Sequence, residues 1–499
     1  MHRLLRAAPI VGAVLILIIL CVHAWVSLPR GEGVNLVSGV WLALARDTQD
    51  GVFYRALAGS GEYGGTRYFP LLFLLIAALL RAGVPAIAAG QVASLVGGAV
   101  LAIGAFRFVR ALGRPSADAS VASALAVAPY LVQQAMFAIR ADPLAAGLVL
   151  NGCAPVARRL RDEPAGRWAL EASVWFALAV AAKATAAYGG AAATLTLALA
   201  HRRRDAVRLA IYCATGWALL IGTIALASDG RAIIAFRATA LAGGSVWALA
   251  QPRFILSIAR VVIGASHLMT VVFVAAAGVL IASPRRWCSL PGLLFVCASA
   301  TAVAAMGTGG TIVANQEIEP YVSAAICLVW VASSDGNWRV AGSMMLAVLL
   351  GWMGVQNVVA IRKIREHAAA HASARAAALN AASACDGVLL SESPLVPAVA
   401  GRRVIVLDPF AFRTAALARP ELTRDLAERI DRREFGCVIL EYDPWSAVGA
   451  GWYEQIDFGR AVIDAIGRNY RLRGVVDEYR VYEPAVTTSA NRSPRSPET

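Results

Sequence analysis

The stretch from Arg46 to Phe69, RDTQDGVFYRALAGSGEYGGTRYF, is a polar and acidic segment between two long apolar runs. It carries two aspartates, Asp47 and Asp50, together with arginines and a Gly-Gly turn. Ionisable residues are costly inside a bilayer, so this segment is expected to face water. We interpret it as the first external loop of a polytopic membrane protein, and Asp47 and Asp50 are the first candidates for catalysis.

The composition favours a membrane protein over a soluble one. The chain has 499 residues, of which 58% are hydrophobic and only 16% are charged. These proportions are far from those of soluble globular domains. Residues 7–28 form an apolar run long enough to cross the bilayer, and the arginines before it place the N-terminus in the cytoplasm.

The net charge of +14 comes largely from arginine clusters between the apolar runs. No surface of interleaved aromatic and basic residues accompanies them, so nucleic acid is not expected as a partner. The positive-inside rule explains the clusters, because basic loops remain in the cytoplasm. The loops predicted to lie inside are 158–167, 201–208, 284–287 and 334–339. The segments predicted to lie outside are those near Arg140, at 228–253, at 307–317 and after about 361.

The apolar runs predict an α-helical polytopic protein with about 11–13 transmembrane helices over residues 1–360. The first external loop takes about 29–68. If the runs at 69–81 and 85–106 both cross the membrane, the basic stretch from Arg107 to Arg114 falls outside, against the positive-inside rule. The first of these runs is also short for a span, about 20 Å long. Either a span boundary is wrong or this basic stretch lies outside for a functional reason.

The C-terminal part has a different pattern. An alanine-rich, charged segment at 361–382 predicts a helical stalk. Strands and helices then alternate over 383–485, which indicates a small external α/β domain with a mostly parallel sheet. The predicted strands are 387–393, 403–410, 437–444 and about 473–482, and the predicted helices are 422–435 and 461–469. Residues 486–499 are predicted to be disordered.

The cysteines and histidines give little indication of a metal site. No CxxC, HxxH or HExxH spacing occurs, so bound zinc is not expected. Cys385 and Cys437 fall in the polar C-terminal part, where they can form a disulfide if that part is external; the sequence leaves this open. The predicted strand ends carry acids that either line a ligand crevice or cap loops, namely Glu392, Asp408, Glu441 and Asp443.

Five polar sites interrupt the apolar pattern, and the predicted topology places all of them on the external side. They are Asp47 with Asp50, Arg67 with Tyr68, Arg140 with Asp142, Lys183, and Asn315 with Glu317 and Glu319. Carboxylates can act as a general base or hold a divalent metal ion. Arginine and lysine at interfacial depth can bind a lipid-borne phosphate. A base beside a phosphate-binding cation is what sugar transfer from a lipid-phosphate donor needs.

Each site also has a structural interpretation. The acids of the first loop could simply be solvated. Arg140 and Asp142 could pair with each other, and Lys183 could extend to the interface. Glu317 or Glu319 could complement a helix dipole.

The order and spacing of these motifs resemble the C-type (GT-C) glycosyltransferases, which are polytopic enzymes that use polyprenyl-phosphate sugars and include bacterial mannosyltransferase and lipopolysaccharide sugar transferases. The resemblance covers about 1–360. It rests on the acidic first loop, Arg67-Tyr68-Phe69-Pro70, Arg140-x-Asp142-Pro143, Lys183-x-Thr185-Ala186, and Asn315 followed by Glu319-Pro320-Tyr321.

The resemblance implies roles for particular residues. An acidic residue of the first external loop acts as base or metal partner in such enzymes, and this role falls on Asp50 first and Asp47 second. Cations near the donor phosphate would be Arg140 and Lys183, with Arg67 beside them. The acids here are spaced as DTQD rather than as an adjacent Asp-Glu pair, so the choice between the two aspartates stays open. An external C-terminal domain would help to bind the acceptor.

The function expected is inverting transfer of a hexose or pentose from a polyprenyl-phosphate donor to an envelope glycan, lipid or protein. Inversion follows from the resemblance alone. The reaction would take place at the external, periplasmic face of the inner (plasma) membrane. The alternative is a secondary transporter or lipid flippase, which also keeps charges in the membrane, but no internal repeat is present. A non-catalytic scaffold would leave the first-loop acids and Lys183 unexplained.

Overall fold

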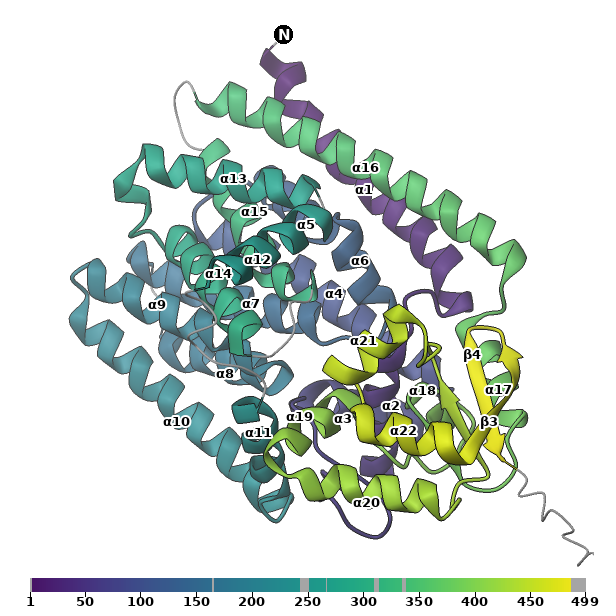
Figure 1. Cartoon of the computed structure of the whole chain (residues 1–499). Coiled ribbons are helices and arrows are strands. Elements are labelled where there is room, and N and C mark those ends of the chain that lie inside the picture. Colours follow the sequence, from purple (N-terminus) through teal and green to yellow (C-terminus); the bar gives the residue numbers. More distant parts are fainter. Residues whose placement is uncertain are drawn as a thin grey trace, which may run out of the picture.

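The predicted fold class is confirmed: a bundle of helices carries a small four-stranded sheet near the C-terminus (Figure 1). The computed structural model describes residues 2–163, 166–242, 251–265, 267–308, 314–333 and 338–485. The tail at 486–499 and most of the predicted inside loop at 334–339 lie outside the described residues, as do parts of the loops at 228–253 and 307–317.

The helices up to residue 370 are α1 (His2–Ser27), α2 (Leu36–Gln49), α3 (Pro70–Arg81), α4 (Ala86–Ala111), α5 (Ser116–Val127), α6 (Tyr130–Phe137), α7 (Asp142–Leu160), α8 (Trp168–Ala182), α9 (Tyr188–Leu199), α10 (Arg203–Ala227), α11 (Arg231–Ala242), α12 (Pro252–Ala265), α13 (His267–Ala282), α14 (Leu290–Thr308), α15 (Ile318–Ala332) and α16 (Trp338–Ala370). Short 3-10 helices are η1 (Leu28–Arg30), η2 (Ala184–Ala187), η4 (Pro284–Arg286) and η5 (Ala314–Glu317).

Several of these helices can cross a membrane. Within the described residues, five are long and apolar enough by themselves, and six if the bent pair α5–α6 forms one span. The five are Ala7–Arg30, Ala86–Ala111, Arg203–Ala227, Leu290–Gly307 and Val340–His367. This is fewer than the predicted 11–13, because shorter apolar helices such as α8, α9 and α13 do not reach the full length of a span by themselves. The chain is a multi-pass membrane protein.

One end of the bundle gathers the arginines, and we call it the arginine end. Arg107 near the end of α4 and Arg158 near the end of α7 both pair with Glu171 at the start of α8, at 3.2 and 3.1 Å. Arg161 Nη1 donates to the Ala111 carbonyl, and Arg114 Nη1 donates to the Ser333 carbonyl after α15. The basic stretch Arg107 to Arg114 therefore lies with the other arginine clusters.

The run at 69–81 is not among the described helices that are long enough to cross a membrane by themselves, which bears on the topological conflict. It forms α3, which runs beside α2 in the same direction, because Arg81 at the end of α3 donates to the Thr48 carbonyl near the end of α2. At 12 residues, α3 is about 18 Å long, too short for a span. The next helix, α4, is long enough for a span, and Arg107 near its end lies at the arginine end.

The sheet has the order β1-β2-β4-β3 and is mixed, so the prediction of a mostly parallel sheet is wrong. Only β1 (Leu389–Ser391) and β2 (Cys437–Leu440) are parallel, whereas β4 (Tyr479–Pro484) is antiparallel to both β2 and β3 (Tyr470–Val476). The predicted last strand is in fact a hairpin, with its turn at Asp477. The helices of this part are α17 (Ala374–Ser383), α18 (Leu395–Val399), α19 (Pro409–Ala418), α20 (Pro420–Asp431), α21 (Ala447–Gln455) and α22 (Arg460–Asn469).

The apolar run at 403–410 is not a strand of this sheet. Its backbone pairs instead with the first loop: Tyr63 N donates to the Ile405 carbonyl at 2.8 Å, and Leu407 N donates to the Tyr63 carbonyl at 2.9 Å. Pattern alone could not reveal this partner, which lies far away in the sequence. The first loop and the C-terminal part also share one hydrophobic core, in which Tyr54 of the loop and Leu72 of α3 lie in the same cluster as Leu389 of β1.

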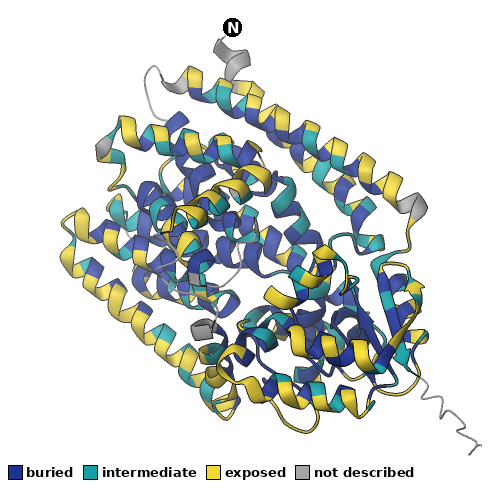
Figure 2. Ribbon diagram, in the orientation of Figure 1, coloured by how far each residue is buried: buried dark blue, intermediate teal, exposed yellow. Residues whose placement is uncertain are grey.

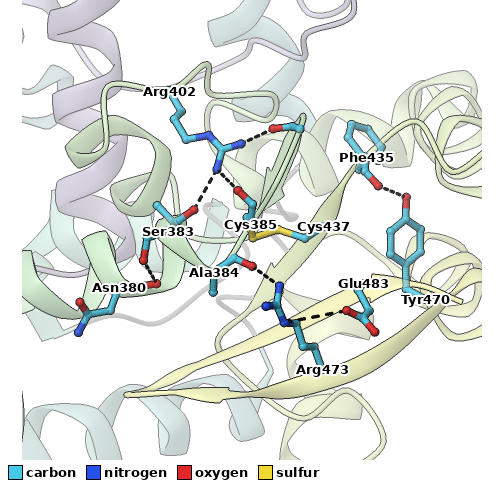
Figure 3. The surroundings of a disulfide bond; sticks show 12 residues. Asn380, Ser383, Ala384, Cys385, Arg402, Phe435, Cys437, Tyr470, Arg473 and Glu483 are labelled. Carbon is cyan, nitrogen blue, oxygen red and sulfur yellow. Dashed lines mark hydrogen bonds and ion pairs between the residues drawn. A yellow bond between two sulfur atoms is a disulfide. The ribbon is translucent and has the colours of Figure 1, made fainter.

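A disulfide joins Cys385, just before β1, to Cys437, at the start of β2 (Figure 3). The Cα atoms of the two cysteines are 5.6 Å apart. The Arg402 guanidinium lies beside the disulfide and donates to the carbonyls of Ala382, Cys385 and Gly387. This part of the chain is thus held by covalent, charged and backbone contacts together.

Candidate active site

A half-buried lysine and two buried carboxylates meet at the end of the bundle opposite the arginine end. Lys183 Nζ lies 2.7 Å from Asp142 Oδ1 and 2.7 Å from Glu319 Oε1. Asn315 Nδ2 donates to the same Asp142 oxygen at 3.2 Å. We call these four residues the lysine cluster. They come from three separate predicted sites, which the fold brings together.

Local structure explains how each side chain reaches the cluster. Asp142 is the first residue of α7 and Glu319 lies in the first turn of α15, where the helix dipole favours negative charge. Lys183 follows the end of α8, where the dipole favours positive charge. Its extended backbone, with φ −157° and ψ 122°, separates α8 from η2 and lets the side chain turn into the bundle.

The lysine cluster carries an excess of one negative charge, because two carboxylates face one ammonium. Asp142 and Glu319 are 5% and 4% exposed. Lys183 is one of only two lysines in the chain, beside 44 arginines. A compact ammonium group on a flexible stem can bridge two carboxylates without the planar geometry that a guanidinium requires.

Arg140 supplies the balancing charge. Its backbone is fixed by Ser94, whose hydroxyl accepts from Arg140 N at 3.0 Å, and its charge acts on both Asp142 and Tyr68. Within the described parts of the chain, the Arg140 guanidinium has no ion-pair partner closer than 4.0 Å. The cluster therefore presents an arginine that can bind an anion from outside the protein.

Arg67 and Tyr68 extend this charged region toward the C-terminal part. The Arg67 guanidinium lies 4.4 Å from the centre of the Phe410 ring on α19. Burial and the nearby Asp408 carboxylate raise the pKa of Tyr68 to about 12, so its hydroxyl remains a proton donor at neutral pH. The Tyr68 ring lies 4.4 Å from the Trp41 ring of α2. Arg67 and Tyr68 therefore share the electrostatic surroundings of Arg140.

Asp47 is held by another part of the first loop. Arg55 Nε donates to Asp47 Oδ2 at 2.6 Å and Arg55 Nη2 to Asp47 Oδ1 at 2.5 Å. Arg55 also donates to the Val404 carbonyl and pairs with Glu62 at 3.3 Å. Burial raises the pKa of the Asp47 carboxyl, and Arg55 only partly opposes this shift. This geometry gives Asp47 a clear role in fixing the loop to the C-terminal part.

Asp50 lies in a different environment. It is exposed, it caps the end of α2, and its backbone N–H donates to the Arg46 carbonyl. Asp50 follows Trp41 by nine residues, about 13 Å along the helix axis, so it lies toward the end of α2 away from Tyr68. The structure thus separates Asp50 from the lysine cluster, while leaving its carboxylate open to solvent.

Glu317 is buried in η5, next to the lysine cluster in sequence. Both of its carboxylate oxygens lack a hydrogen-bond partner among the described residues. Burial raises the pKa of Glu317 to about 7. The described residues include no group of three or more His, Cys, Asp or Glu side chains arranged to hold a metal ion.

Sequence reasoning missed Arg55 and the contribution of α19. Arg55 lies in the same loop as Asp47, eight residues later. Its positive charge could have been read as a sign that it pairs with Asp47. Asp408 was considered only as a strand end, although Asp-Pro is a common start of a helix. In the structure Asp408 caps α19, and its Oδ1 accepts from Ala411 N at 3.0 Å.

No family model matches the chain, and no curated protein matches it. Solved structures do. ArnT from Cupriavidus metallidurans bound to undecaprenyl phosphate is 13% identical, with a TM-score of 0.59, over 95% of this chain and 98% of that chain. The Archaeoglobus fulgidus oligosaccharyltransferase in its apo form is 11% identical, with a TM-score of 0.55, over 95% of this chain and 75% of that chain. AglB from the same organism, in complex with an inhibitory peptide and a dolichol-phosphate, has a TM-score of 0.53 at 12% identity, over 94% of this chain and 74% of that chain.

These similarities extend over nearly the whole chain, from the helices to the C-terminal sheet. ArnT is similar over almost its entire length as well. The chain therefore has the same fold as ArnT and AglB.

Proposed function

We propose that this protein is a glycosyltransferase that moves a sugar from a polyprenyl-phosphate donor to an acceptor of the cell envelope. The observation that carries the proposal is the lysine cluster with the unpaired Arg140 beside it. The Arg140 guanidinium, which has no ion-pair partner among the described residues, offers a group that can bind an interfacial phosphate, within a polar setting that strengthens the interaction. Solved structures of the same fold contain undecaprenyl phosphate and dolichol-phosphate, which supports a lipid-phosphate donor.

In this proposal, Arg140 and Lys183 bind the donor phosphate and Arg67 flanks it. These cations neutralise the charge that develops on the phosphate as the glycosidic bond breaks. A carboxylate removes the proton of the acceptor hydroxyl, whose oxygen attacks the anomeric carbon as the phosphate leaves. Two carboxylates compete for this role. Asp50 has an exposed carboxylate but lies toward the end of α2 away from Tyr68, whereas Asp142 lies inside the lysine cluster but is paired with Lys183. Asp47 is already paired with Arg55.

The reaction would occur on the external side of the membrane. The arginine end is assigned to the cytoplasm by the positive-inside rule, which puts the lysine cluster and the C-terminal part outside. The Cys385–Cys437 disulfide supports this orientation, because disulfides persist in oxidising compartments.

The test is sugar transfer in membranes that contain the wild type, Asp50→Asn, Asp47→Asn or Asp142→Asn, with a panel of radiolabelled polyprenyl-phosphate sugars. Of Asp50→Asn and Asp142→Asn, the variant that loses at least about 100-fold in rate, the usual contribution of a general base, identifies the base. Asp47→Asn should lose activity only in step with the amount of folded protein. Normal rates for both Asp50→Asn and Asp142→Asn would remove the base role from both residues.

The same assay tests the phosphate site. Arg140→Gln should raise the KM for the lipid-linked donor, and Arg362→Gln, an exposed arginine of α16, is the matched control. Wild-type protein that transfers no sugar from any donor of the panel would contradict the proposed function.

A further inference from the structure

A groove rich in arginine lies between α19, α20 and α22 in the C-terminal part, and Figure 2 shows that the outer faces of α20 and α22 are exposed. Its volume is about 590 Å³. Four arginines from three helices line it, together with a single carboxylate: Arg413, Arg424, Arg460 and Arg468, with Asp464. We call this feature the arginine groove. Its lining carries a net charge of +3, the difference between these four arginines and Asp464.

Three of the four arginines are not held in close ion pairs. Among the described residues, Arg413 donates only to the Glu454 carbonyl, at 3.1 and 3.4 Å. Arg460 Nε lies 3.8 Å from Asp464, a distance too long for a hydrogen bond. Arg424 forms no ion pair within the part of the chain that the structure describes. Arg468 alone is well paired, with Asp431 at 3.0 Å.

Asp431 of α20 pairs with Arg468 and so neutralises one of the four groove arginines. Asp425 accepts a hydrogen bond from the Tyr63 hydroxyl. In the described part of the chain, Arg413 and Arg424 are left without an acidic partner. An ordinary solvated surface would intersperse the two signs of charge. Here positive groups from three helices converge on one concavity, which is the arrangement that binds phosphate or carboxylate groups.

The groove and Arg67 of the candidate active site both contact α19. Phe410, whose ring contacts Arg67, and Arg413, which lines the groove, are three residues apart on this helix. Positions three apart are neighbours on a helix surface, with a rise of about 4.5 Å between them. Arg67 and the groove therefore contact neighbouring positions of the same helix.

We propose that the arginine groove binds the anionic part of the acceptor, a saccharide that carries phosphate or carboxylate groups. This role rests on the proposed glycosyltransferase function, because it places the acceptor where its free hydroxyl group can reach the donor at the lysine cluster. Binding of the anion itself does not depend on that function and can be measured separately.

The experiment measures binding of fluorescently labelled oligosaccharides to the full chain in a neutral detergent. The probes are an oligogalacturonate, a phosphorylated malto-oligosaccharide and a neutral malto-oligosaccharide. The groove variant is Arg413→Gln with Arg424→Gln. Its matched control is Arg471→Gln with Arg473→Gln, which removes the same charge from the exposed strand β3.

We expect the wild type to bind at least one acidic probe, and the groove variant to bind it about tenfold more weakly, as for the loss of one or two charged hydrogen bonds. The control variant should bind within about twofold of the wild type, and the neutral probe should not bind. The tighter acidic probe identifies carboxylate or phosphate as the preferred group. Added salt should weaken binding of the wild type more than that of the groove variant.

Three results would overturn the proposal: no binding of either acidic probe, equal binding of the neutral probe, or equal weakening in the groove and control variants. The last result would mean that net charge alone attracts the probes. If the groove variant binds more weakly but the protein transfers no sugar, the groove is an anion-binding site and the acceptor role is wrong. Sugar transfer without groove-dependent binding would refute the groove and leave the transferase.

Discussion

Lys183 compensates two buried carboxylates at once, so its removal should be costly. We expect Lys183→Met to destabilise the protein by about 3–5 kcal/mol, because the buried Asp142 and Glu319 would then lose the ammonium group that bridges them. Lys363→Met, at the only other lysine, is the control, since that residue is exposed on α16. Thermal unfolding of both variants in detergent would check this. Equal melting temperatures would show that the cluster contributes little to stability.

Glu441, which follows β2, should make stability depend on pH. Burial and the neighbouring Glu392 carboxylate raise the pKa of Glu441 to about 8 in the folded protein, whereas it titrates near its usual value when unfolded. The folded state therefore holds a proton that the unfolded state loses as the pH rises. The stability from this group is complete below about pH 4 and falls as the pH rises to about 8.

The measurement is the melting temperature of the wild type and Glu441→Gln at several pH values across this window. We expect the wild type to lose stability toward pH 8 and the variant to lose less. Parallel curves for the two proteins would contradict the assignment to Glu441.

At the scale of the elements, α2 depends on a close approach to α18. A Cβ added to Gly39 would lie 2.1 Å from the backbone nitrogen of Leu395. Because that neighbour is backbone, it cannot turn aside, and Gly39→Ala should cost about 1–3 kcal/mol. Gly278→Ala in α13 is the control, since its Cβ would meet nothing within 4 Å. Unchanged denaturation midpoints in both variants would show that α2 can shift without cost.

The elements also show what the sequence could and could not predict. Long apolar runs predicted α1, α4 and α10 directly, because a membrane span requires about 20 predominantly apolar residues in a row. The path of α3 could not be predicted, since a 12-residue apolar helix fits both a short span and a helix lying beside α2. The backbone pairing of Tyr63 with residues 405–407 could not be predicted either. A periodic pattern predicts an extended segment, but it does not indicate which other segment that one pairs with.

The candidate site was predicted in part. Residues that stand alone in apolar runs, such as Asp142 and Lys183, were found because burial of charge demands a partner. The sequence also indicated that they share one side of the membrane. It could not show that Lys183 bridges two acids, because this contact depends on how separate helices pack. It also could not show that Arg55 pairs with Asp47, because this contact depends on how the first loop folds.

At the scale of the whole molecule, the Cys385–Cys437 disulfide links the start of the sheet across 52 residues. A loop of this size corresponds to about 4 kcal/mol of stabilisation in the chain-entropy account. Cys385→Ser with Cys437→Ser should therefore unfold at a markedly lower temperature, and the wild type should respond to reductant in the same way. A wild type whose melting temperature is unchanged by reductant would contradict the bond or its importance.

The contacts between the first loop and the C-terminal part have a consequence for biosynthesis. Glu62 and Arg403 form an ion pair across 341 positions, and at about 5–20 residues per second the ribosome needs roughly 20–70 s to make the intervening chain. During that interval the loop must wait, already outside the membrane, with its backbone groups bonded to water. The residues that hold the first loop in place are thus synthesised last. A chain interrupted before residue 400 would contain every helix of the bundle and would still lack an ordered first loop.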